Sequence, residues 1–296
     1  MNLQQMRCLA GLARQNLRVS ATARALSTSQ PAVTKQLRQL ENELGTSLFV
    51  REQNRIATLT KVGEQVVSLA QEVCVSINSM NRVAAEARRP GAGDIRIATT
   101  HALAKFVLPE LMQGFSSRFP KARFELIHTP SLQIDSSVVA GKVDLGMTPQ
   151  EGKPRKELRV LKYQTFPRVI LVPKKHPLLR ARSLDLRGLA AYPIITSAGA
   201  SVSGVFDVFS ASNIDVNIRL IAPDFDVVKA CIDRGFGIAI LPGYTYDPEQ
   251  DRQIRAIDAS DLFPPTVTSI VVRKNHHLPT LVREFLDTLV PGRASG

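Results

Sequence analysis

The chain has 296 residues, of which 44% are hydrophobic and 22% charged, so its composition is that of a globular protein and excludes disordered and fibrous classes. At roughly 150 residues per domain, this length predicts two or more domains. Thirty-eight lysines and arginines outnumber 26 acidic residues, and the net charge of +12 favours a polyanionic partner such as nucleic acid or an acidic membrane surface.

The three cysteines are an odd number without a CxxC pair, which indicates neither a disulfide framework nor a zinc site and favours a reducing compartment. The N-terminal residues lack the apolar core of a signal peptide. No stretch approaches the roughly 18 apolar residues of a membrane span. We therefore expect a cytoplasmic protein with no membrane partner.

The first 60 residues are the most basic part, with eight bases against three acids. The spacing of Leu3, Met6, Leu9 and Ala13 predicts a first helix. A second short helix is expected after Ser20 as N-cap, with Ala21, Ala25 and Leu26 turned inward. A third should start at the hydroxyl-rich segment 27–31, bury Val33, Leu37, Leu40 and Leu44, and stop at Gly45.

The opposite face of this third helix is polar and predicts contacts with DNA. Residues 48–60 are expected to form a two-stranded wing. Together with the helices before it, this wing makes a winged helix-turn-helix. The residues predicted to contact phosphates or base edges are Ser29, Gln30, Pro31, Thr34, Lys35, Arg38, Arg51 and Arg55. Because any surface helix has a solvated polar face, spacing alone leaves an ordinary exposed surface open as the alternative.

A long helix is predicted over 61–89, before the break at 89–93. Its apolar positions recur every 3.5 residues, which is typical of a coiled coil and predicts pairing with a second chain. The predicted dimerisation residues are Val66, Leu69, Val73, Met80 and Val83, and Ser76 interrupts the stripe. The alternative is an amphipathic helix packed within its own domain.

After the break, short strands alternate with helices such as 108–119 and 225–234. The strands are expected at 94–99, 123–127, 143–147, 169–172, 194–196, 218–221, 238–241 and 269–272. This alternation predicts an α/β region with largely parallel sheets.

Hydroxyl groups follow four of these strands, where an open α/β sheet binds small ligands and helix N-termini favour anions. The candidate ligand-binding residues here are Thr99, Thr100, His101, Ser131, Thr148, Thr196 and Ser197. Serine and threonine are also common helix caps, so a structural role is the alternative for each.

Three segments resemble one known family. Residues 21–45 (ATARALSTSQPAVTKQLRQLENELG), 48–51 (LFVR) and 59–63 (LTKVG) resemble the winged helix-turn-helix of LysR-type transcriptional regulators. The resemblance implies a DNA-binding domain at 1–60, a linker and dimerisation helix at 61–89, and an effector-binding domain at 90–296 like periplasmic solute-binding proteins. It also implies a double-stranded DNA operator, a dimer that pairs into a tetramer, and RNA polymerase as a partner if the protein activates.

Residues 2–7 (NLQQMR) and 97–101 (IATTH) are most similar to the CysB-like branch, which regulates sulfur assimilation and sulfonate use. This resemblance implies that Thr100 binds a small anion, with Thr148 and Thr196 nearby. Polar residues follow the histidine in that branch, whereas this chain has Ala102 and Leu103, so we expect an effector with an apolar part, an organosulfonate or an aromatic carboxylate.

The resemblance also divides the effector domain into two lobes, about 92–163 with 268–296, and 164–267. It places Phe225, Asp226 and the loop 235–237 (GFG) near the cleft between them. The alternative is a structural role for both segments, as a helix start and as a turn that enters a strand.

Catalytic signatures are missing from the sequence. There is no GxSxG nucleophile elbow, no P-loop and no GxGxxG after the first strand, and the five histidines have no metal-site spacing, so we expect no enzyme activity, metal or cofactor. The alternative is a solute-binding or enzymatic α/β domain with an accessory module that binds DNA without sequence preference.

Overall fold

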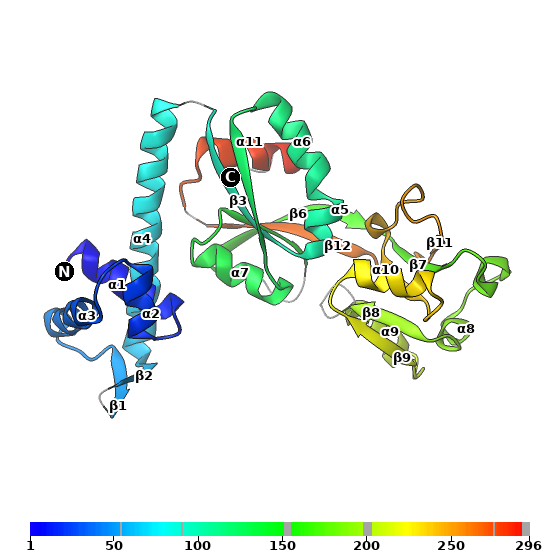
Figure 1. Cartoon of the computed structure of the whole chain (residues 1–296), viewed down its shortest axis with the longest axis horizontal. Helices are drawn as coiled ribbons and strands as arrows, with labels where there is room; N and C mark the ends of the chain where they lie inside the picture. The colour runs from blue at the N-terminus through cyan, green and yellow to red at the C-terminus, as the bar shows by residue number, and fades with distance from the viewer. Residues whose placement is uncertain (54, 90, 151–154, 198–202, 275, 292–296) are drawn as a thin grey trace. The chain divides into compact units, whose positions relative to one another are not determined.

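The computed structural model describes residues 1–53, 55–89, 91–150, 155–197, 203–274 and 276–291. The chain divides into two compact units, Met1–Pro90 with His276–Pro279, and Gly91–Asn275 with Thr280–Gly296 (Figure 1). In the described part of the chain, no helix combines the length and the apolar character needed to cross a membrane.

The first unit is a winged helix-turn-helix followed by a long helix, as predicted. Its elements are α1 (Leu3–Arg14), α2 (Val19–Ala25), α3 (Gln30–Leu44), β1 (Phe49–Glu52), β2 (Arg55–Leu59) and α4 (Lys61–Arg88). The strands β1 and β2 pair antiparallel and form the wing. Side chains from α1, α3, the wing and the first half of α4 share one hydrophobic core.

The start of α2 differs from the prediction. The helix begins at Val19 after Arg18, so Ser20 lies inside it and is not the N-cap. The side chains that α2 buries are Thr22 and Ala23, whereas Ala25 is exposed. The hydroxyl of Thr22 donates to the carbonyl oxygen of Arg18, 2.9 Å away, so this buried polar group has a hydrogen-bond partner one turn earlier in the chain.

The bounds of α3 follow from its caps. The Ser29 side chain accepts a hydrogen bond from the Ala32 backbone, and Gly45 ends the helix in the left-handed region with φ +64°. The predicted stripe Val33, Leu37 and Leu40 is buried, but Leu44 is 38% exposed, and so is Leu3 at 37% in the first turn of α1. Both leucines lie at helix ends that extend past the core.

The second unit begins with a five-stranded sheet in the order β4-β3-β5-β12-β6. These strands are β3 (Gly93–Thr99), β4 (Ala122–His128), β5 (Leu145–Pro149), β6 (Leu158–Phe166) and β12 (Thr266–Arg273), and the helices are α5 (His101–Phe106), α6 (Leu108–Arg118), α7 (Ser131–Val139) and α11 (Thr280–Leu289). Strand β3 is parallel to β4 and β5, but β12 is antiparallel to β5 and β6. We call this sheet and its helices the first lobe.

The second lobe contains a three-stranded antiparallel sheet, β10-β7-β11, and a parallel pair, β8-β9, joined to it by a bridge between Ile194 and Ile238. Its elements are β7 (Arg168–Pro173), η1 (Pro177–Arg180), α8 (Leu186–Ala190), β8 (Ile194–Ser197), α9 (Ser203–Ala211), β9 (Ile218–Ala222), α10 (Phe225–Asp233), β10 (Ala239–Pro242), η3 (Gly243–Thr245) and β11 (Ile254–Asp258). The prediction of largely parallel sheets is therefore wrong, because both lobes are mixed.

The chain passes between the lobes twice, from β6 to β7 and from β11 to β12. Arg168 lies directly after the first passage, and its Nε donates to the carbonyl oxygen of Pro264 in the second passage, 3.4 Å away. This contact joins the two passages.

Candidate functional site

The polar face of α3 forms an open groove. Gln30, Pro31, Thr34, Lys35 and Arg38 line it together with Gln39 and Asn42. Most of these side chains are exposed, because the buried stripe on the other side of the helix fixes its orientation. The structure thus brings five of the predicted DNA-contacting residues onto one surface, while Ser29 is engaged as the cap of the same helix.

One carboxylate that the sequence analysis missed fixes the start of the wing. Oε1 of Glu41 accepts hydrogen bonds from the backbone amides of Leu48 and Phe49, at 2.8 and 3.3 Å. Its Oε2 pairs with Arg51 at 2.5 Å, so the predicted DNA-contacting residue Arg51 already has an anionic partner. The side chain of Arg55, the other predicted wing contact, lies outside the described residues.

The two faces of α4 differ. Val67, Ala70 and Cys74 pack into the core of the first unit. Four of the five predicted dimerisation residues lie on the other face: Leu69 and Met80 are 59% and 66% exposed, and Val73 and Val83 are also exposed. Val66 is half-buried and packs against the core of the first unit, so its place on the exposed stripe is not confirmed. An apolar stripe thus remains in contact with solvent on a helix that already has a packed face.

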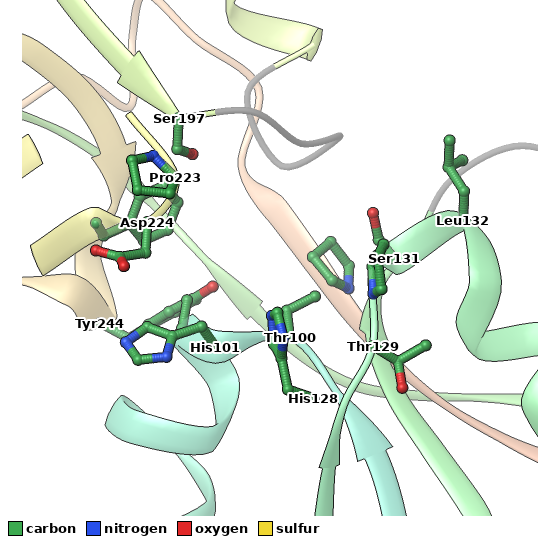
Figure 2. Close-up of a pocket in the computed structure, with 14 residues that line it drawn as sticks. Thr100, His101, His128, Thr129, Ser131, Leu132, Ser197, Pro223, Asp224 and Tyr244 are labelled. Carbon is green, nitrogen blue, oxygen red and sulfur yellow. The ribbon is translucent and has the colours of Figure 1, made fainter. Parts of the chain in front are cut away.

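Between the two lobes lies a cavity of about 200 Å³ (Figure 2). Of the predicted effector-binding residues, Thr100, His101, Ser131, Ser197 and Phe225 line it. The cavity is smaller than the roughly 300–1,000 Å³ of sites for drug-sized ligands, so it suits a small molecule.

The remaining predicted residues do not reach this cavity. Thr99, Thr148 and Thr196 are buried and are not among its described lining residues. The hydroxyl of Thr148 donates to the carbonyl of Pro149. Of the two apolar residues that follow His101, Ala102 lines the cavity, whereas Leu103 is fully buried.

Each lobe contributes a helix start to the cavity. In the first lobe, α7 begins at Ser131 after Pro130, and no side chain caps it. In the second lobe, α10 is capped by Asp224, whose Oδ1 accepts a hydrogen bond from the Val227 amide, 2.9 Å away. Figure 2 shows Ser131 on one side of the cavity and Asp224 on the other.

A cluster of charged side chains joins α5 of the first lobe to α10 of the second. Asp226 pairs with His101, 3.1 Å from Nε2 to Oδ2, and with Lys105. Burial alone would raise the pKa of the Asp226 carboxyl, but hydrogen bonds from Lys105 and His101 outweigh it and lower this pKa. The residue predicted to bind the effector, His101, therefore also bridges the lobes.

Tyr244 lines the cavity where the two passages of the chain meet. Its ring packs against Phe166 and Phe106 with centroids 4.7 and 6.5 Å apart, and its buried hydroxyl has no hydrogen-bond partner in the described part of the protein. Burial raises the pKa of Tyr244 and lowers the pKa of the neighbouring Arg168 to about 10. Sequence patterns gave no signal for Tyr244, Asp224 or Arg168 as parts of this region.

A metal site is the other chemistry to consider here. The ligand atoms of His101, Asp224 and Asp226 all lie within 4.8 Å of one another. Both oxygens of Asp226 already accept hydrogen bonds, one of them from the Lys105 ammonium, and one oxygen of Asp224 caps α10. The arrangement is therefore that of an ion-pair cluster.

Comparison with known proteins decides the family. Residues 3–64 match the bacterial regulatory helix-turn-helix protein family of LysR type, and residues 88–293 match the LysR substrate binding domain. The chain belongs to the LysR family. It is a transcriptional regulator of LysR type with a two-lobed effector-binding domain.

Two relatives and one solved structure place this LysR-family regulator with the CysB-like branch. It is 32% identical over 294 residues to the regulator CysB of Haemophilus influenzae, covering 98% of this chain and 90% of that protein. It is 30% identical to SsuR of Burkholderia cenocepacia, covering 98% and 95%. The cofactor-binding domain of the Cbl regulator superposes with a TM-score of 0.64 at 27% identity, covering 68% of this chain and 89% of that domain.

The position of Glu41 in this LysR-family regulator yields a test of the wing. Glu41→Gln removes the negative charge that accepts hydrogen bonds from two backbone amides and pairs with Arg51. We expect the free energy of local unfolding at the wing to fall by about 1–2 kcal/mol. Amide hydrogen exchange at Leu48 and Phe49 should then be roughly 5- to 30-fold faster. Glu52→Gln, the same change at an exposed wing position, is the control, and unchanged protection in Glu41→Gln would contradict the assignment.

Proposed function

We propose that this regulator is a cytoplasmic dimer that binds a specific DNA operator and responds to a small anionic effector bound between its lobes, in control of sulfur or organosulfonate metabolism. The domains are 1–60, 61–89 and 90–296, with lobes of about 92–163 with 268–296, and 164–267. Pairing into a tetramer, and contact with RNA polymerase if the protein activates, belong to the same proposal. The observation that carries it is the cavity between the lobes, joined in one chain to the exposed polar groove of α3.

The groove on α3 supports sequence-specific recognition. Its N-terminal half offers the amide of Gln30 and the hydroxyl of Thr34, which hydrogen-bond to base edges in a major groove. Arg38 lies further along the helix and also lines a second shallow surface with Arg51 at the wing. We assign base contacts to the first two residues and phosphate contacts to Arg38.

This division predicts two kinds of DNA-binding defect. Gln30→Ala should lose about 1–3 kcal/mol of discrimination between operator and unrelated DNA, because it removes a base contact. Arg38→Ala should weaken binding to all sequences alike and reduce the salt slope by about one. Titrations of both DNAs over a range of salt concentrations measure both effects.

Gln4→Ala, an exposed glutamine on α1 outside the groove, is the matched control. If Gln30→Ala and Arg38→Ala reduce specificity equally, the assigned orientation of α3 is wrong. If the wild-type protein gives no sequence-specific footprint, the proposal that the α3 groove recognises a DNA operator is wrong.

The exposed stripe on α4 supports a dimer. Leu69 and Met80 lie on the face that the first unit leaves uncovered, with the 3.5-residue spacing of a coiled coil. Leu69→Glu should raise the dissociation constant of the dimer by at least about 100-fold, since two copies of a buried leucine are lost. Sedimentation equilibrium measures it.

The control for the dimer is Asn78→Glu, which adds the same charge at an exposed position outside the stripe. Dissociation of the control as well would point to a general effect of charge on α4. If the dimer of Leu69→Glu has the same dissociation constant as the wild-type dimer, α4 is not the dimer contact.

The cavity supports an anionic effector. The start of α7 carries no capping side chain, and Thr100 precedes α5 without making a side-chain cap. Ala102, Pro130 and Phe225 add apolar lining, which fits an organosulfonate or an aromatic carboxylate. Because the cavity has walls from both lobes, a ligand that prefers one arrangement of the lobes shifts the regulator toward that arrangement.

A thermal-shift screen against sulfate, thiosulfate, organosulfonates, acylated amino acids and aromatic carboxylates tests this proposal. A ligand of the native state raises the melting temperature. Thr100→Val should weaken binding of the hit by about tenfold or more, because it removes a hydroxyl that hydrogen-bonds to the charged group of the ligand. The helix α5 loses no cap, since the Thr100 side chain does not cap it.

The matched control is Thr288→Val, an exposed threonine on α11 away from the cavity. Sulfate bound as tightly as any organic anion would contradict the expected apolar part. A hit that is indifferent to Thr100→Val would place the effector elsewhere.

A further inference from the structure

The two helix starts at the cavity have opposite electrostatic character. The start of α7 has no capping side chain and no acidic residue in its first turn, so its backbone amides present partial positive charge. The start of α10 is capped by the carboxylate of Asp224 and has Asp226 in its first turn. A simple anion is attracted by the first wall and repelled by the second.

Asp224 has no cationic partner in the described part of the protein. Among the described residues, the one hydrogen bond to its carboxylate comes from the Val227 amide, although Asp224 is half-buried and lines the cavity. Lys105 pairs with Asp226, and His101 hydrogen-bonds to Asp226 as well. The neighbouring carboxylate is therefore neutralised, and that of Asp224 is left without a counter-charge.

A second polar group of the same wall also lacks a partner. Ser197 is 7% exposed and lines the cavity, and its hydroxyl forms no hydrogen bond with any described residue. Figure 2 shows Ser197 on the same side as Asp224, across from Ser131 and Leu132. The unpartnered hydroxyl of Tyr244 lies in this lobe too. A carboxylate with hydroxyl oxygens around it is a set of acceptors suited to an ammonium group.

We propose that the effector is a small zwitterion, such as an aminoalkanesulfonate or an amino acid, which spans the cavity. Its acidic group binds at the start of α7 beside Thr100 and Ser131, and its ammonium group donates to Asp224 and Ser197. This inference rests on the proposed function, because it names the chemistry of the effector that the cavity holds. A ligand of this kind contacts both lobes through opposite charges and so favours a closed cleft.

Matched ligand pairs test the proposal on the full-length protein. The probes are 2-aminoethanesulfonate against 2-hydroxyethanesulfonate, and 3-aminopropanoate against 3-hydroxypropanoate, measured by calorimetric titration. Each pair differs only in the ammonium group. The wild-type protein should bind at least one amine-bearing member about tenfold tighter than its hydroxyl partner.

Asp224→Asn is the informative variant, because asparagine caps a helix as well as aspartate does and the start of α10 is retained. It should bring the two members of the pair within about twofold of each other. Asp185→Asn, the same change at the N-cap of α8, should leave the preference intact.

The outcomes separate this inference from the proposed function. If the wild-type protein binds both members of a pair equally, or if the preference for the amine persists in Asp224→Asn, the zwitterion proposal is wrong. The proposal of an anionic effector is not affected by either result. If no member of either pair binds and no anion of the wider screen does, the effector cleft itself is overturned.

Discussion

The contact of α5 with the start of α10 determines the geometry of the cleft. The Asp226 carboxylate of the second lobe forms ion pairs with His101 and Lys105 of the first lobe. The ammonium group of Lys229 in the second lobe lies 4.9 Å from the centroid of the Phe106 ring in the first. The same short helix follows Thr100 at the edge of the cavity. Because one helix carries both the ligand-facing residue and the groups that join the lobes, a ligand that moves the start of α5 acts directly on the contact between the lobes.

Local signals allowed the first unit to be predicted in detail. The serine cap and the left-handed glycine that bound α3 act within a few residues, and its buried stripe follows the helical period. The same rules failed at Ser20, because tertiary packing set the start of α2 and a buried Thr22 supplied its own hydrogen bond to the preceding turn. Leu44 shows a second limit, since the hydrophobic period continues past the point where the core ends.

Long-range pairing explains what was missed in the second unit. The strands β6 and β11 were not predicted, because their sequences, LRVLKYQTF and IRAID, do not alternate cleanly. Both are placed by their neighbours, β12 and β7, to which they pair antiparallel. Alternation of strands and helices along the chain could not reveal that β12 returns from the second lobe into the first sheet, and this return makes the sheet mixed.

The cleft shows why residue type at strand ends predicts only half of a site. Hydroxyls after strands pointed to Thr100, Ser131 and Ser197, which line the cavity, but equally to Thr148 and Thr196, which are buried beside it. The carboxylate of Asp224 reads in the sequence as an ordinary helix cap, and it is one. Only the approach of the two lobes shows that this cap also faces a cavity, where its unneutralised charge bears on which ligands can bind.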